Sequence, residues 1–173
     1  MSEQKYPWVL HIFKGEGRYA FQPMIRNKWL IRINAEDYCF LDENEGAYML
    51  GSTALEMMDY IKNSPCPSVQ ANDAPQSERL SKYGTWPKFF KGNLLTCFSY
   101  DGIEYQVMSQ ERISRRGGGS GYCGMIEGAK LPITASAEEI GEAILKVFDA
   151  AEKFYSVGKY KPKRQRNTKK TEE

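Results

Sequence analysis

Histidine is almost missing from this chain of 173 residues, in which His11 is the only one. One histidine cannot build a multi-histidine metal site. It could serve a nucleophilic cysteine as a base, but no spacing in the sequence selects a particular cysteine. His11 also falls inside a predicted strand. We therefore expect a structural residue there, and no metal or cofactor.

Closely spaced cysteines are missing as well. Cys39, Cys66, Cys97 and Cys123 are about 30 residues apart and form no C-x-x-C pair. A disulfide scaffold would be denser in cysteine, and a zinc site would pair its ligands closely. The spacing predicts four reduced and mostly buried thiols.

Long apolar runs do not occur. No run approaches the ~20 residues that span a bilayer. The N-terminus begins Met-Ser-Glu-Gln-Lys-Tyr-Pro and lacks the basic and then apolar regions of a secretory signal. We expect a cytoplasmic protein with no membrane partner.

Apolar side chains are nevertheless sufficient for a core, since 41% of the residues are hydrophobic and 13% aromatic. The charge is unevenly distributed. From Lys159 onward, seven basic residues against Glu172 and Glu173 give +5, which leaves −3 for residues 1–158 of the net +2. We predict one mildly acidic domain over 1–158 and a disordered basic tail over 159–173.

Alternating patterns predict the strands. Residues 8–13 lead to a turn at 15–17, residues 18–22 follow and stop at Pro23, and residues 28–33 alternate with Trp29, Ile31 and Ile33 on one face. Residues 94–100 and 103–108 flank Asp101-Gly102, which suits a type I′ hairpin turn. The glycine-rich stretch 109–128 reads as a loop.

Capping patterns predict two main helices. The first begins near Thr53, with Glu56 at capping-box spacing, and ends at Ser64-Pro65. Residues 64–77 read as a loop, with a short helix at 77–83. The last helix begins at Ser136 with Glu139, carries an apolar stripe to Tyr155 and uses Gly158 as its C-terminal cap. The fold class is α+β, an antiparallel sheet covered on one face by helices.

Two short motifs match known sites only in part. Residues 119–124 fit G-x-G-x-x-G, but neither the strand before it nor the helix after it is predicted, so we read a flexible loop. Asp42, Asn44 and Gly46 resemble the start of a calcium loop, whose fifth and twelfth positions here are Gly46 and Thr53 instead of ligands.

Acidic residues gather where basic ones are missing. Between Ile33 and Ile61 there is no Lys or Arg, and seven residues are acidic: Glu36, Asp37, Asp42, Glu43, Glu45, Glu56 and Asp59. This stretch is either a solvated acidic loop or a recognition surface for a basic partner.

Two segments together resemble a known family. Residues 22–33, QPMIRNKWLIRI, resemble a QP-x-x-R-N-K-Y-x-I-R-I stretch, and residues 131–144, LPITASAEEIGEAI, resemble an I-S-x-x-S-x-E-E-I-G-x-A-I/L stretch. Both occur in this order in an immunity-protein family of bacterial contact-dependent growth inhibition. Leu50-Gly51 before the first helix also fits. The loop 117–124 and the basic tail depart from the family pattern.

The resemblance implies a cytoplasmic protein that binds and neutralises a cognate toxin domain and is not an enzyme. Many such toxins are nucleases, whose phosphate-binding surfaces are basic. From charge alone, we expect the acidic segment to bind the toxin, with two tyrosines as anchors; the candidate residues are Glu36, Asp37, Tyr38, Asp42, Glu43, Glu45 and Tyr48.

Two alternatives remain open. The basic tail with Arg115 and Arg116 would suit an accessory protein that contacts nucleic acid without sequence preference. An enzyme of an unfamiliar kind could use Cys123 in the glycine-rich segment.

Overall fold

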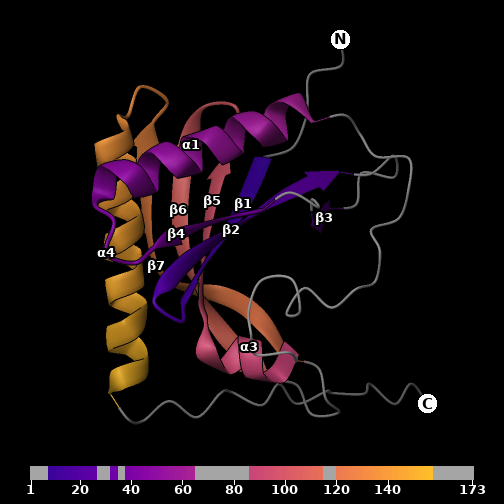
Figure 1. The fold of residues 1–173 in the computed structure, drawn as a ribbon, viewed down its shortest axis with the longest axis vertical. Helices are drawn as coiled ribbons and strands as arrows, with labels where there is room; N and C mark the ends of the chain where they lie inside the picture. Colours follow the sequence, from indigo (N-terminus) through magenta and orange to yellow (C-terminus); the bar gives the residue numbers. More distant parts are fainter. Residues whose placement is uncertain (1–7, 27–31, 35–37, 65–85, 115–119, 158–173) are drawn as a thin grey trace, which may run out of the picture.

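A computed structural model of the chain describes residues 8–26, 32–34, 38–64, 86–114 and 120–157. Seven strands form one antiparallel sheet in the order β3-β2-β1-β5-β6-β7, with β4 also paired to β2. Figure 1 shows α1 lying across the strands and α4 running along one side of the sheet. The predicted fold class is therefore confirmed. Predictions for residues 65–85 and 158–173, which include the short helix at 77–83, the cap Gly158 and the tail, lie outside the described residues.

The first hairpin joins β1 (Trp8–Gly15) to β2 (Arg18–Arg26). Gly15 pairs with Arg18, so the turn has two residues, Glu16 and Gly17, both at positive φ. Positive φ at both central positions is the requirement of a type I′ turn, which follows the twist of the strands. The predicted turn at 15–17 is confirmed.

Pro23 does not end the second strand, contrary to the prediction, because β2 continues to Arg26. On its outer edge, β2 pairs with β4 (Cys39–Asp42) through Phe21 and with β3 (Arg32–Asn34) from Met24 onward. Pro23 lies between these two pairings. A proline is tolerated at an edge position where no ladder hydrogen bond is needed.

The second half of the sheet is longer than predicted. β5 (Leu94–Tyr100) pairs with β6 (Glu104–Ser114), which confirms the hairpin, and β6 pairs with β7 (Ser120–Pro132). The turn is not type I′, because Gly102 has positive φ and Asp101 does not. The prediction of a loop over 109–128 was wrong for residues 109–114 and 120–128, which belong to β6 and β7, and residues 115–119 lie outside the described residues. The glycine-containing part of β7 fits the sheet through register shifts in the β6–β7 pairing and a positive φ at Gly124.

The first helix, α1 (Ala47–Asn63), begins six residues before the predicted start at Thr53. Its N-cap is Gly46, which offers no side-chain hydrogen bond, so the sequence gave no capping signal there. Thr53, Glu56, Leu50 and Gly51 all lie inside the helix. Its end before Ser64 is as predicted, since Pro65 follows.

The last helix, α4 (Ala137–Ser156), forms the predicted capping box. The side chain of Ser136 accepts from the Glu139 backbone N–H, and the Glu139 carboxylate accepts from the Ser136 backbone N–H. The predicted apolar stripe is buried from Ile140 to Ala151. α4 packs against α1 as well as against the sheet.

The sheet buries apolar residues on both faces. One face packs under α1 and α4, with Leu10, Ile12, Phe21 and Phe98 at its centre. The other face carries a smaller cluster in which Phe89 of α3 (Trp86–Gly92) packs on Phe13. Alternation along the strands separates the two sets. The short helix α3 was not predicted.

Candidate partner-binding surface

Three of the acidic candidate residues lie at the turn between β4 and α1. Asp42 ends β4, Glu43 and Glu45 lie in the turn, and Tyr48 belongs to the first turn of α1. Asp42, Glu45 and Tyr48 are exposed, the last by 60%. Asp42, Glu43, Glu45 and Tyr48 lie close together because they are neighbours in sequence. Glu36 and Asp37 lie outside the described residues.

The turn has a defined backbone. The carboxylate of Asp42 accepts from the Asn44 backbone N–H and side-chain amide, each at 2.9 Å, and the Glu45 N–H donates to the Asp42 carbonyl at 3.1 Å. An aspartate that holds the second residue after it in this way is a common turn former. Calcium binding is not needed to explain Asp42 and Asn44.

Glu43 has a different role from its neighbours. Its carboxylate lies 3.1 Å from the ammonium nitrogen of Lys14, which also contacts Glu152 of α4 at 2.6 Å. Burial alone would lower the pKa of Lys14, but hydrogen bonds with Glu152 and Glu43 outweigh it and raise that pKa. Glu43 is thus partly neutralised, and Asp42 and Glu45 are the turn carboxylates that face solvent.

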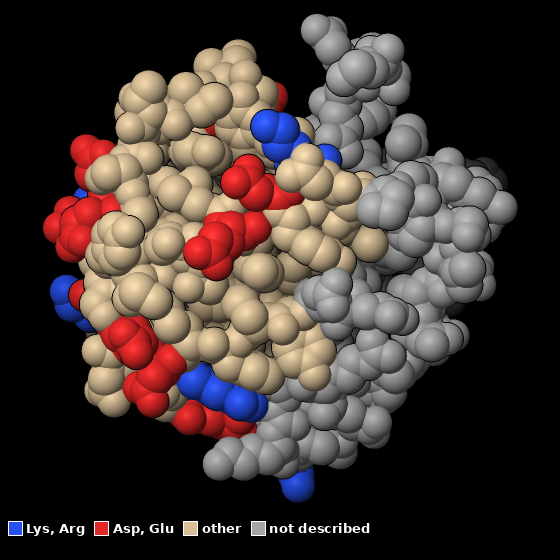
Figure 2. Space-filling view, turned by 45° about the horizontal axis from the view of Figure 1, so that its top comes forward, with Lys and Arg blue, Asp and Glu red and all other residues tan. Residues whose placement is uncertain are grey.

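The acidic surface continues along α1. Glu56 and Asp59 are exposed and three residues apart, so they lie on one side of the helix. Figure 2 shows acidic side chains in several patches over the face that carries α1, with fewer basic ones. We call Asp42, Glu45, Glu56 and Asp59 the acidic surface.

Apolar side chains border the acidic surface. Phe40, Tyr48 and Met49 are exposed by 40%, 60% and 43%. Tyr38 is half-buried, stacks edge-on against Phe40 with 5.4 Å between ring centroids, and packs against the cluster around Phe13. Tyr48 therefore fits the anchor role predicted for it better than Tyr38. Sequence reasoning missed Phe40 of β4 and Met49 of α1, because their exposure depends on how β4 and the start of α1 pack.

The opposite face of the sheet is hollowed over β1, β5 and β6. A hollow of about 390 Å³ is lined in part by His11, Cys97, Ser99 and Gln106. His11 and Cys97 are direct cross-strand partners on β1 and β5. Sequence spacing could not select Cys97 because nothing indicates which strands pair. Cys123 is exposed on β7, beyond β5 and β6 from His11.

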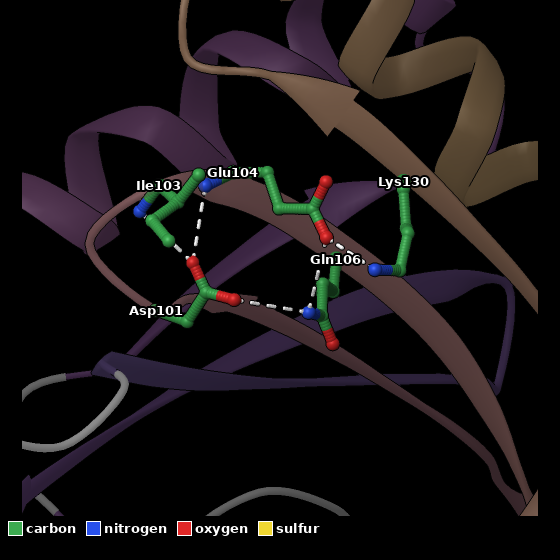
Figure 3. A network of polar contacts seen from close by, with 5 residues as sticks. All are labelled: Asp101, Ile103, Glu104, Gln106 and Lys130. Atoms are coloured by element: carbon green, nitrogen blue, oxygen red, sulfur yellow. Dashed lines mark hydrogen bonds and ion pairs between the residues drawn. The ribbon is translucent and has the colours of Figure 1, made fainter.

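Asp101 and Gln106, which also line this hollow, belong to a polar network at the β5–β6 turn (Figure 3). Asp101 accepts from the backbone N–H groups of Ile103 and Glu104 and from the Gln106 amide, and Glu104 pairs with Lys130. The two backbone hydrogen bonds, that from Glu104 first, hold the pKa of Asp101 below its usual value. The network accounts for the β5–β6 turn and presents no free acid–base pair.

The described residues contain neither a membrane-spanning helix nor a candidate metal site. None of their helices is both long and apolar enough to cross a membrane. They also contain no group of three His, Cys, Asp or Glu side chains placed to hold a metal ion.

Comparison with known proteins shows similarity in fold alone. No protein-family model and no curated protein matches the chain. A protein of unknown function from Neisseria meningitidis shares the fold, at 12% identity and a TM-score of 0.55, over 86% of this chain and 98% of that one. So does a chain of the CdiA-CT/CdiI toxin and immunity complex from Yersinia pseudotuberculosis, at 11% identity and a TM-score of 0.54, over 83% and 97%.

Proposed function

We propose that this protein is an immunity protein of contact-dependent growth inhibition, which binds a cognate toxin domain and blocks it. The observation that carries the proposal is the fold shared with a chain of a toxin and immunity complex, over almost the whole of that chain. We take the matching chain to be the immunity component. The two sequence segments that resemble the immunity family support the same function independently.

The acidic surface is the proposed toxin-binding site. Its exposed carboxylates lie beside exposed apolar side chains, and a recognition site needs both, because charge guides encounter and apolar anchors retain the partner. A basic toxin surface would be complementary. Since nucleases hold phosphates with Lys and Arg, we propose a nuclease as the toxin and the cytoplasm as the place of binding.

The first experiment co-expresses this protein with the C-terminal domain of a large exported protein encoded immediately upstream. We expect a stable complex and rescue of growth. The Asp42→Lys/Glu45→Lys variant should bind on the order of 10- to 100-fold more weakly, mainly through slower association at low salt.

The matched control is Glu104→Lys. Glu104 lies at the β5–β6 turn, at the opposite end of the strands from Asp42. Reversing its charge should leave affinity within about twofold, because it is far from the two carboxylates that the double variant changes and screening weakens interactions between distant exposed charges. A complex that is insensitive to the double variant would reject the acidic surface but retain the function. No complex and no rescue would reject the function, and RNA binding of the protein with and without residues 159–173 would then be measured.

A further inference from the structure

Lys14 connects three elements that are distant in sequence. It lies near the end of β1, and its side chain is only 11% exposed. Its ammonium reaches Glu43 in the β4–α1 turn and Glu152 near the end of α4. The same nitrogen lies 6.0 Å from the ring centroids of Tyr19 and Phe148. A half-buried ammonium with two carboxylates and two rings has a single preferred position.

Strand pairing and this contact both hold the turn. β4 pairs with β2 as far as Asp42, which lies opposite Arg18. The Glu43 N–H donates to the Gly17 carbonyl, which ties the turn backbone to the β1–β2 turn. Its other backbone hydrogen bonds, Glu45 N–H to Asp42 and Leu50 N–H to Gly46, are local. Gly46 supplies no side-chain cap. The Lys14–Glu43 ion pair therefore adds a side-chain link from the turn to the body of the protein.

We propose that Lys14 is a positioning residue for partner binding. Lys14 bridges Glu43 and Glu152 and so fixes the turn that follows Asp42. Asp42 and Glu45 then meet the partner in one arrangement. Fixing a loop in its bound conformation raises affinity because less ordering remains to be done on binding. The inference rests on the proposed function and assigns to Lys14 a role at the same surface without contact with the partner.

The test compares Lys14→Met, which keeps the aliphatic stem and removes the charge, with Lys14→Arg, which keeps the charge. Lys130→Met is the matched control, since it removes the lysine of the Glu104 ion pair at the other end of the strands. The first readout, amide exchange of Glu43 and Glu45 in the isolated protein, needs no partner. We expect exchange on the order of 10-fold faster in Lys14→Met, and unchanged in Lys14→Arg and Lys130→Met.

The second readout is affinity for the upstream-encoded toxin domain. Lys14→Met should weaken binding on the order of 10-fold. In the Asp42→Lys/Glu45→Lys background, the same change should cause a much smaller loss, because residues that act through one surface are not additive. Lys14→Arg should bind within about twofold of wild type, because a guanidinium also makes charge-assisted hydrogen bonds with carboxylates.

The outcomes separate the two proposals. Additive losses, or faster exchange spread evenly over β1, β4 and α4, would mean that Lys14 only stabilises the fold and would overturn its positioning role. Unchanged exchange at Glu43 and Glu45 in Lys14→Met would overturn it too. A wild-type protein that does not bind the domain would reject the toxin-binding function, while the exchange data would still decide whether Lys14 orders the turn.

Discussion

Gly51 of α1 and Gly141 of α4 face each other where the two helices cross. A Cβ on Gly51 would lie 2.8 Å from the Gly141 backbone nitrogen, and a Cβ on Gly141 would lie 2.9 Å from the Cα of Ala47. Both glycines are buried. The crossing therefore brings backbone against backbone, and this close approach outweighs the low helix propensity of glycine.

Alanine at either glycine should therefore destabilise the fold. Gly51→Ala and Gly141→Ala should each lower the free energy of unfolding by about 3 kcal/mol or prevent folding, because the clashing atoms are backbone and cannot rotate away. Urea unfolding measures the change. Ser52→Ala and Glu142→Ala, one residue away, should stay within ~0.5 kcal/mol. A stable Gly51→Ala variant would mean that the helices separate without cost.

A substitution at Thr96 should raise the free energy of unfolding. It is fully buried on β5, and its hydroxyl has no hydrogen-bond partner within the described structure. Thr96→Val keeps the shape and removes the unsatisfied group, so unfolding free energy should rise by up to about 1 kcal/mol. Thr96→Ser keeps the hydroxyl but loses a methyl group, and should be destabilising. A loss of stability in Thr96→Val would show that the hydroxyl is paired in solution.

The capping box of α4 predicts a dependence on pH. Hydrogen bonds from the Ser136 backbone N–H and then its hydroxyl hold the pKa of Glu139 below its usual value. The stabilisation is thus present above the unfolded pKa of ~4.3 and is lost as pH falls through the folded pKa. Wild type should exceed Glu139→Gln in stability at pH 7, and the difference should shrink below pH ~4. A difference independent of pH would exclude the carboxylate as its source.

Ser136→Ala tests the other half of the box. It should cost about 1 kcal/mol, because the Glu139 N–H loses its acceptor. Chemical denaturation at pH 7 measures this, with Ser156→Ala at the far end of α4 as the control. An equal effect of both substitutions would contradict a specific role for the cap.

The cysteines should differ in reactivity. Cys123 is exposed, Cys97 is buried, and burial, with a smaller contribution from Glu56, raises the pKa of Cys39 to about 11. Because the thiolate is the reactive form, Cys39 should be labelled slowly at pH 8. In a Cys66→Ser background, a thiol reagent followed by mass spectrometry should modify Cys123 first. Fast labelling of Cys39 would mean that β4 opens from β2.

Elements with strong local signals were predicted from the sequence. The turn at 15–17 and the capping box at Ser136 each depend on residues that are neighbours in sequence, and both are in the structure. The start of α1 was missed because Gly46 has no capping side chain. The strand β7 was missed because Gly121, Gly124 and Gly128 weaken its pattern, although pairing with β6 forms it.

The candidate site divides in the same way. Asp42, Glu45 and Tyr48 are close in sequence and so could be grouped by charge alone. The ion pairs of Lys14 with Glu43 and Glu152 depend on how β1, β4 and α4 come together, and residues 138 positions apart give no local sign of contact. The pairing of His11 with Cys97 was hidden for the same reason.

The glycine crossing lies apart from the proposed partner-binding surface. Gly141 lies in the segment 131–144 that resembles the immunity family, Leu50-Gly51 also fits the family pattern, and both glycines allow the close approach of the two helices. The β4–α1 turn lies outside that fit, so its side chains can change without disturbing the helix pair. A common framework could thus carry different recognition surfaces, and binding of new partners could be designed by exchanging Asp42, Glu45 and Tyr48 while Glu43 and Ala47 stay in place.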